Sequence, residues 1–140
     1  MELIRLDDRL RLNIPEIDSQ HENVIELVNG LHEALVGGAD KAARGGLLSQ
    51  LLEGMRSHCA FEEESMLRYG YPGYLAHKSE HDRLKQNLVD LIERYRNGEL
   101  VLSIAVVMEF KCWATIHIEK SDKPLGAFLI DQKGSETARD

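Results

Sequence analysis

The sequence predicts several amphipathic helices, each with a stripe of apolar residues along one face. Histidines and carboxylates occupy positions on these stripes. His58 and Glu62 are four residues apart, and so are His77 and His81, so each pair shares one face of a helix. Buried imidazoles and carboxylates are unfavourable unless they are paired or coordinated, and the stripes hold too few Lys and Arg residues to pair them. The pattern therefore predicts that the helices meet around a metal centre. Its candidate ligands are His21, His58, Glu62, His77, His81, His117 and Asp122.

The number of these ligands indicates more than one metal ion. Five imidazoles and two carboxylates are too many for one small ion, and they suit two iron ions that the carboxylates bridge. Zinc or manganese remains an alternative, because ligand softness does not exclude it. A set of ordinary buried histidines is the alternative without metal, and the regular spacing argues against it.

Four stretches of the chain carry an apolar repeat of helical period. They run from Asp18 or Ser19 to about Leu35, from between Asp40 and Leu47 to about Tyr69, from about Gly73 to Arg96, and from about Glu99 to Ile118. Short glycine-containing breaks separate them. Amphipathic helices with such short connections predict an all-α fold, an antiparallel up-down four-helix bundle.

The two ends of the chain lack the long helical repeat. Residues 1–17 are expected to form an extended N-terminal arm that packs inward through Leu12, Ile14 and Ile17. A short C-terminal helical turn is expected around residues 125–129, and residues 133–140 are expected to form a frayed polar tail. Residues 1–140 are interpreted as a single domain.

Composition narrows the classes of partner. The net charge is −7 and no basic block is present, which argues against nucleic acid or an anionic membrane as the main partner. No apolar run reaches the roughly 20 residues that span a bilayer, and the N-terminus lacks a signal-peptide core. Two isolated cysteines are typical of a reducing compartment, so a cytoplasmic location is expected.

The order and spacing of four strings resemble the hemerythrins, and most closely the single-domain bacteriohemerythrins. The strings are I-D-S-Q-H ending at His21, H-C-A-F-E-E from His58, G-Y-P-x4-H-K-S-E-H ending at His81, and W-A-T-I-H-I-E-K-S-D-K from Trp113. The resemblance covers roughly residues 6–129 and implies a non-haem di-iron site. In that site His77, His81 and His117 would hold one iron, and His21 and His58 would hold the other. Glu62, Asp122 and a solvent-derived oxo or hydroxo group would bridge them.

The resemblance also implies reversible dioxygen binding, for oxygen storage, transport or scavenging. Dioxygen, or a small anion such as azide or chloride, would bind at the open position of the two-histidine iron. An enzyme is not expected, because seven ligands nearly saturate the irons. An oxygen or redox sensor module remains an alternative, as does a di-iron peroxidase or nitric-oxide-handling enzyme. The sequence identifies no partner protein.

The family's dioxygen pocket corresponds here to Cys59, Trp113, Ala114 and Ile118. Cys59 stands where the family usually has phenylalanine, and Ala114 stands where leucine is common. Both changes remove side-chain volume, which predicts a wider or wetter pocket and faster autoxidation of the oxygenated form. Leu6 replaces a usual tryptophan, which affects only the packing of the arm.

Several other polar side chains are interpreted as structural. His32 lies eleven residues after His21, about 16 Å along a helix, which is too far to share the site. Glu63 and Glu64 are expected to be solvated, and Asp18 is expected to cap the first helix. The thiols of Cys59 and Cys112 are expected to be buried and inert.

Overall fold

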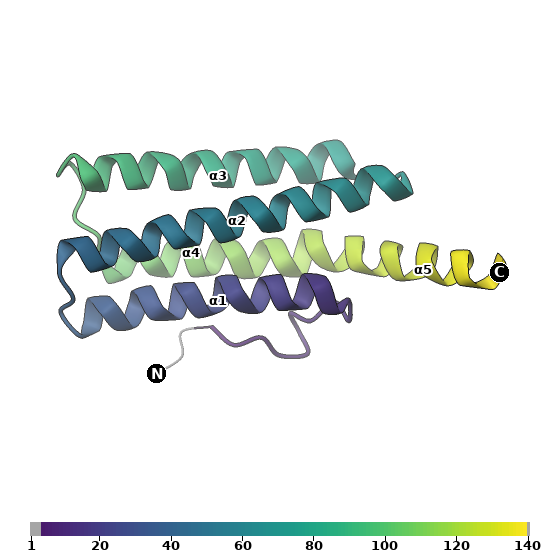
Figure 1. Cartoon of the computed structure of the whole chain (residues 1–140), viewed down its shortest axis with the longest axis horizontal. Helices are drawn as coiled ribbons and strands as arrows, with labels where there is room; N and C mark the ends of the chain where they lie inside the picture. The colour runs from purple at the N-terminus through teal and green to yellow at the C-terminus, as the bar shows by residue number, and fades with distance from the viewer. Residues whose placement is uncertain (1–3, 140) are drawn as a thin grey trace.

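The helices of the chain alternate in direction along one common axis (Figure 1). The computed structural model describes residues 4–139, with side chains through Lys133. The four helices of the bundle are α1 (Pro15–Val36), α2 (Lys41–Tyr69), α3 (Tyr74–Arg96) and α4 (Ile104–His117). A π-helical turn, η1 (Ile118–Asp122), joins α4 to α5 (Lys123–Arg139). The predicted all-α antiparallel four-helix bundle is confirmed.

The N-terminal arm lies along α1 (Figure 1). Paired hydrogen bonds between Ile4 and Asn29 hold it there. The amide of Ile4 donates to Oδ1 of Asn29, and Nδ2 of Asn29 donates to the carbonyl of Ile4, each over 2.8 Å. Leu12, Ile14 and Ile17 are buried, as the sequence predicted. The arm is therefore part of the packed molecule and closes one side of the bundle.

The first helix begins at Pro15, earlier than the sequence predicted, and Asp18 does not cap it. Proline suits the first turn of a helix, where an amide donor is not needed. Asp18 lies inside that turn, and its carboxylate accepts from the amides of Leu12 (2.8 Å) and Asn13 (3.0 Å). Asn13 has φ +63°, so the arm makes a sharp turn there. Asp18 thus binds the arm to the helix start.

The other helix boundaries follow from local side chains. Asp40 caps α2 by accepting from the amide of Ala43, and Gly70 ends α2 in the left-handed conformation at φ +67°. Ser103 caps α4 by accepting from the amide of Val106. The fourth helix therefore begins later than the predicted Glu99.

The C-terminal helix is longer than the single turn that the sequence predicted. Pro124 lies at the second position of α5, directly after η1, where a missing amide donor is tolerated. Leu125 and Leu129 then bury their side chains against the core. The helix continues through Arg139, so the backbone of residues 133–139 of the predicted tail is helical, while residue 140 lies outside the described residues.

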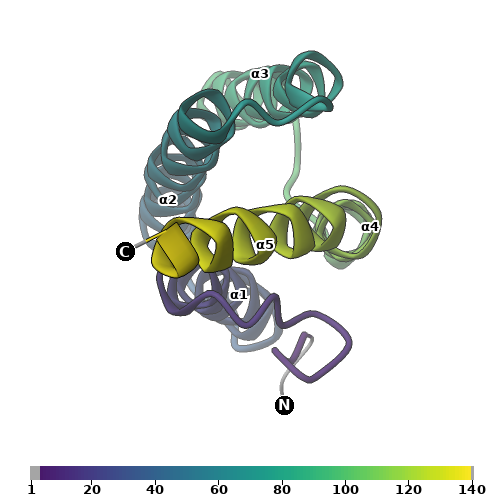
Figure 2. The ribbon, with the colours of Figure 1, turned by 90° about the vertical axis from the view of Figure 1, so that its right-hand side faces the viewer.

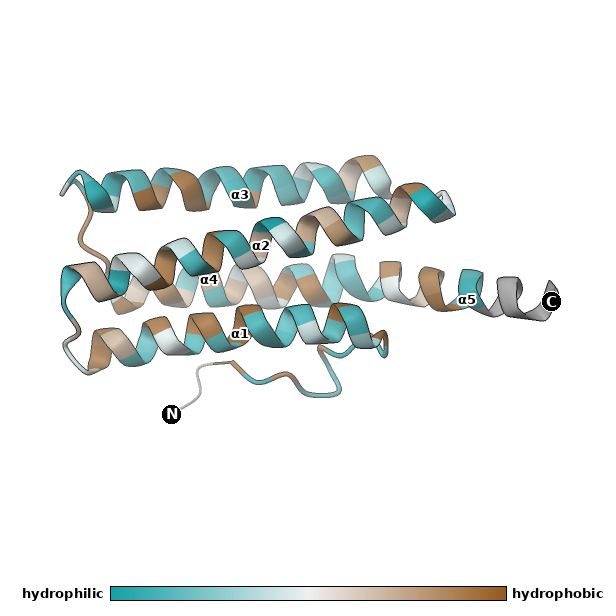
Figure 3. Cartoon of the chain, in the orientation of Figure 1, coloured by the Kyte–Doolittle hydropathy of each residue, from teal (hydrophilic) through white to brown (hydrophobic). Residues whose placement is uncertain are grey.

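The core lies between the helices, with α1 packed on α2 and α4, and α2 packed on α3 (Figure 2). Apolar residues recur along every helix, separated by polar ones on the outer faces (Figure 3). In the part of the chain that the structure describes, no helix is both long and apolar enough to cross a membrane. The bundle encloses its polar centre between α1, α2, α3 and the junction of α4 with α5.

The close contact between the arm and α5 predicts that Gly126 cannot be replaced by a larger residue without loss of stability. A Cβ built on Gly126 would lie 2.9 Å from Cγ and 3.1 Å from Cβ of Leu12, closer than packed carbons approach. We expect Gly126→Ala to lower the free energy of unfolding by about 1–3 kcal/mol, because buried Leu12 must shift with its backbone. Urea denaturation of the metal-free protein measures this.

Gly46→Ala is the matched control. Gly46 lies in α2 with nothing within 4 Å of an added Cβ. Alanine there is expected to raise stability by about 0.5–1 kcal/mol through helix propensity. Equal stability changes in the two variants would contradict the proposed contact.

Candidate metal centre

Each of the four bundle helices, α1 to α4, contributes a side chain to one buried polar centre. α1 supplies His21, α2 supplies His58 and Glu62, α3 supplies His77 and His81, α4 supplies its last residue His117, and η1 supplies Asp122. None of the seven is more than 7% exposed. The structure thus brings together all seven residues that the sequence singled out as candidate ligands.

Each of the two carboxylates spans the centre from side to side. For Glu62, Oε2 lies 3.0 Å from Nε2 of His58, and Oε1 lies 3.0 Å from Nε2 of His77 and 3.2 Å from Nε2 of His81. One oxygen therefore faces the side of the centre formed by α1 and α2, and the other faces α3.

Asp122 repeats this arrangement. Its Oδ2 lies 2.9 Å from Nε2 of His21, while Oδ1 lies 2.9 Å from Nε2 of His77 and 3.0 Å from Nε2 of His117. The seven side chains therefore form two overlapping groups whose ligand atoms lie within 4.8 Å of one another. One group has three histidines and the other has two, and both include Glu62 and Asp122.

Unpaired buried atoms indicate that this centre could hold cations. Oε2 of Glu62, Nε2 of His81, Nε2 of His117 and both oxygens of Asp122 are buried without a hydrogen-bond partner. Nε2 of His21 also lies 3.0 Å from Nε2 of His58, two ring nitrogens facing each other. Buried polar atoms are nearly always satisfied, and metal ions would satisfy all of these at once.

The π turn brings the last two candidate ligands together. His117 and Asp122 are five residues apart, one more than the usual helical repeat. A π turn closes an i→i+5 hydrogen bond, and such turns are frequent at functional sites. The spacing of the two residues, followed by Pro124, was the signal in the sequence for this local widening of the helix.

Charge inside the centre controls the protonation of its side chains. Burial opposes protonation of His58 and His77, but the carboxylates of Glu62 and Asp122 outweigh it and raise the pKa of His58 to about 10 and of His77 to about 9. Burial and mutual repulsion oppose ionisation of the carboxylates. The surrounding imidazoles nevertheless hold the pKa of Glu62 and of Asp122 well below their usual values. Without metal, protons shared among these groups balance the buried negative charge.

Two side chains that hold the outer edges of the imidazoles were missed by the sequence analysis. Nδ1 of His81 donates to Oε2 of Glu63 over 3.0 Å, and Nδ1 of His58 donates to Oε1 of Gln20 over 2.8 Å. The prediction that Glu63 is solvated was wrong, since its side chain is only 15% exposed. Both residues directly adjoin a candidate ligand in the sequence, which was the only signal available.

The remaining polar side chains lie elsewhere. Among the described residues, His32 joins neither group of candidate ligands, as the sequence predicted. Cys59 is buried as expected. The prediction that Cys112 is buried was wrong: Cys112 is exposed, and the buried residues of α4 are Val107 and His117.

A small cavity of about 30 Å³ adjoins the centre. Both histidines of the two-histidine group, His21 and His58, line it, whereas His117 is the one histidine of the three-histidine group that does. The expected pocket residues Trp113, Ala114 and Ile118 also line it. The ring of Trp113 stacks on His117 at 5.0 Å between centroids.

Cys59 does not line this cavity. Its sulfur is grouped instead with Glu63 and His81, on the α3 side of α2. Of the two small residues expected to widen the pocket, only Ala114 is in a position to do so.

Comparison with known proteins agrees with this geometry. Residues 12–129 match the model of the hemerythrin HHE cation binding domain. The chain belongs to the hemerythrin family. This family binds non-haem iron and dioxygen, and the buried cluster of histidines and carboxylates is of the type that holds its metal.

Bacteriohemerythrins are among the relatives of the chain. That of Methylococcus capsulatus is 32% identical over 84% of this chain and 88% of its own length. That of Stenotrophomonas maltophilia is 33% identical over 88% and 79%. A crystal structure of wild-type hemerythrin superposes with a TM-score of 0.86 at 29% identity, covering 91% of this chain and 98% of that one.

The raised histidine pKa values predict opposite effects of pH on the metal-free and metal-bound proteins. The metal-free protein gains stability from protonated His58 and His77 that is fully present below about pH 6.5 and is lost as pH rises toward 9 to 10. Its Tm should therefore fall over that range. Metal binding displaces these protons, so metal affinity should rise with pH over the same range. Calorimetry of both forms measures the two trends, and a metal-free Tm that rises from pH 6.5 to 9 would contradict the charge balance.

Proposed function

We propose that this chain holds two iron ions at the buried centre and binds dioxygen reversibly at one of them. The observation that carries the proposal is that Glu62 and Asp122 are shared between two unequal groups, one of three histidines and one of two. In the proposal His77, His81 and His117 hold one iron, and His21 and His58 hold the other.

The unequal groups leave one coordination position for a ligand. With iron bound, His77, His81 and His117 would supply three ligands to one ion, and Glu62, Asp122 and a solvent oxygen would supply the rest of a six-coordinate shell. The ion held by His21 and His58 would share those three groups and would be left with one position for a further ligand. The 30 Å³ cavity is lined by both histidines of that group and by one histidine, His117, of the other, and its volume suits a diatomic molecule or a small anion such as azide or chloride.

The protein supplies position and exclusion of water, while the bound irons supply the electrons that make dioxygen binding reversible. Val24, Ile25 and Met55 give the cavity apolar walls, which slow the entry of water and ions. Trp113 covers one face of the His117 ring and fixes its orientation. A cavity of this size has no room for a second organic substrate, which favours ligand binding over oxygenase catalysis.

Optical spectroscopy of the iron-loaded protein tests the proposal. The protein is reduced without air, exposed to dioxygen and then deoxygenated, and its iron is counted. We expect two irons per chain and a charge-transfer band that appears with dioxygen and disappears on deoxygenation. Immediate irreversible oxidation would instead support the sensor or enzyme alternative, and absence of iron binding would overturn the proposal.

The size of residue 114 is expected to set the lifetime of the oxygenated form. Ala114→Leu should slow autoxidation several-fold, because the larger side chain narrows the cavity and excludes water. Ala105→Leu, on an exposed position of the same helix, is the control. The decay of the charge-transfer band measures the rate, and equal rates in both variants would show that Ala114 does not control access.

A further inference from the structure

The imidazoles on opposite sides of the centre have outer partners of different charge. We propose that this difference makes the two metal positions unequal, with Glu63 and Gln20 as the positioning residues. The carboxylate of Glu63 strengthens metal binding and favours the oxidised ion at the three-histidine position. Gln20 orients the corresponding ring at the two-histidine position without adding charge. The inference rests on the proposed two-metal site.

Glu63 fixes both the orientation and the tautomer of His81. Nδ1 of His81 lies 3.0 Å from Oε2 of Glu63, while Nε2 of the same ring points to the centre, 3.2 Å from Oε1 of Glu62. A carboxylate only accepts, so Nδ1 carries the hydrogen and Nε2 keeps its lone pair for a metal ion. The His81 side chain is 1% exposed and that of Glu63 is 15% exposed, so solvent screens their interaction little.

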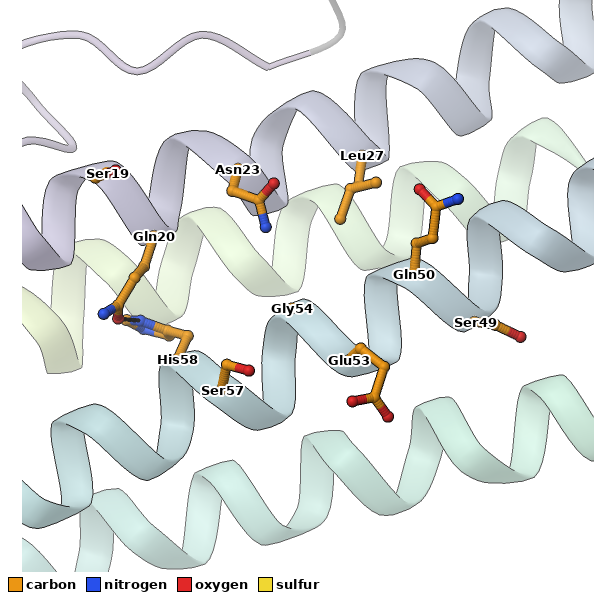
Figure 4. A pocket seen from close by; sticks show the side chains of 10 residues that line it. All are labelled: Ser19, Gln20, Asn23, Leu27, Ser49, Gln50, Glu53, Gly54, Ser57 and His58. Carbon is orange, nitrogen blue, oxygen red and sulfur yellow. Dashed lines mark hydrogen bonds between the residues drawn. The ribbon is translucent and has the colours of Figure 1, made fainter.

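Gln20 fixes the same tautomer of His58 without a charge. Nδ1 of His58 donates to Oε1 of Gln20 over 2.8 Å. Figure 4 shows the Gln20 side chain reaching from α1 to the ring of His58 on α2, at the end of the groove between the two helices. The His58 ring is therefore as well oriented as that of His81, but its partner is neutral.

A second carboxylate lies on the three-histidine side. Oε2 of Glu80 is 3.8 Å from Nδ1 of His117 and accepts from the hydroxyl of Ser121 over 2.7 Å. This distance is too long for a hydrogen bond to the ring. The Glu80 side chain is also 48% exposed, so solvent screens much of its charge, and Glu63 remains the main source of negative charge beside this metal position. On the other side, Nδ1 of His21 is buried without a hydrogen-bond partner among the described residues.

The unequal partners have a direct consequence for the metals. A carboxylate that accepts from an imidazole N–H makes the ring a stronger electron donor, and such charge-assisted bonds are about twice as strong as neutral ones. A stronger donor favours the higher metal charge. The three-histidine ion, which does not bind dioxygen, is therefore held more tightly and oxidised more readily than the two-histidine ion.

A charge-neutralising variant tests Glu63 independently of dioxygen. The protein is loaded with Co²⁺ without air, and an excess of chelator then removes the metal. We expect two release phases in the unaltered protein, and a slow phase that Glu63→Gln accelerates about 10–100-fold while the fast phase stays unchanged. His21→Ala, which weakens only the two-histidine position, should alter only the fast phase and so assigns the phases.

The reverse change tests Gln20. Gln20→Glu places a carboxylate beside Nδ1 of His58 and should slow the fast phase, so that the rates of the two phases become more alike.

Redox potentials provide a second measurement. In the iron-loaded protein, Glu63→Gln should raise the midpoint potential of the three-histidine iron, and Gln20→Glu should lower that of the two-histidine iron. A tenfold change in the preference for the oxidised ion corresponds to about 59 mV for one electron.

Glu64→Gln is the matched control. Glu64 is the next residue in α2 and is exposed, so its neutralisation removes the same charge without touching a ring. Circular dichroism establishes that the variants fold. Equal release rates and potentials in Glu63→Gln and Glu64→Gln would overturn the inference, even if the protein binds dioxygen reversibly. Unequal phases that respond to Glu63→Gln, in a protein that fails to bind dioxygen reversibly, would support the inference and refute the proposed function.

Discussion

Two fully buried carboxylates, Glu62 and Asp122, are the constraint on which the rest of the bundle depends. An ionised carboxylate is stable in an apolar interior only when opposite charge or a metal ion surrounds it. Here the compensating groups come one or two at a time from α1, α2, α3 and α4, so no pair of helices can satisfy the carboxylates alone. The polar centre thereby fixes the relative positions of all four helices in a way that apolar packing alone would not.

Six of the seven candidate ligands could be predicted because each lies on an apolar stripe, whereas Asp122 lies beyond the predicted fourth helix and was found through the string that begins at Trp113. A histidine or an acidic residue is rare at a core position and therefore stands out. The spacing of four residues between His58 and Glu62 also places both side chains on the same face of the helix. The same reasoning failed for Glu63. α2 packs against α1 on one side and α3 on the other, so a residue next to the stripe is covered as well. A single stripe cannot reveal a helix with two covered faces.

Contacts between distant parts of the chain were also outside the reach of sequence patterns. The arm contacts α5 where Leu12 meets Gly126. These residues are more than 100 positions apart, and no local pattern around either one predicts the contact. Cys59 and Ala114 are both smaller than the family's usual residues, yet they lie on different sides of the centre. Ala114 faces the cavity, whereas Cys59 lies toward Glu63 and His81. The two losses of volume are therefore not equivalent, because only the one at Ala114 adjoins the cavity.

The imbalance of the centre originates in the distribution of histidines among the helices. α3 supplies two buried histidines, His77 and His81, from adjacent turns of one face. α1 and α2 supply one histidine each. Since both carboxylates are shared, the extra imidazole alone makes one position fuller than the other. The outer partners act in the same direction, because a carboxylate supports His81 and an amide supports His58. The position with more ligands is thus also the position with more negative charge, so in our proposal the two-histidine position is the weaker site and the one at which a neutral diatomic ligand would bind.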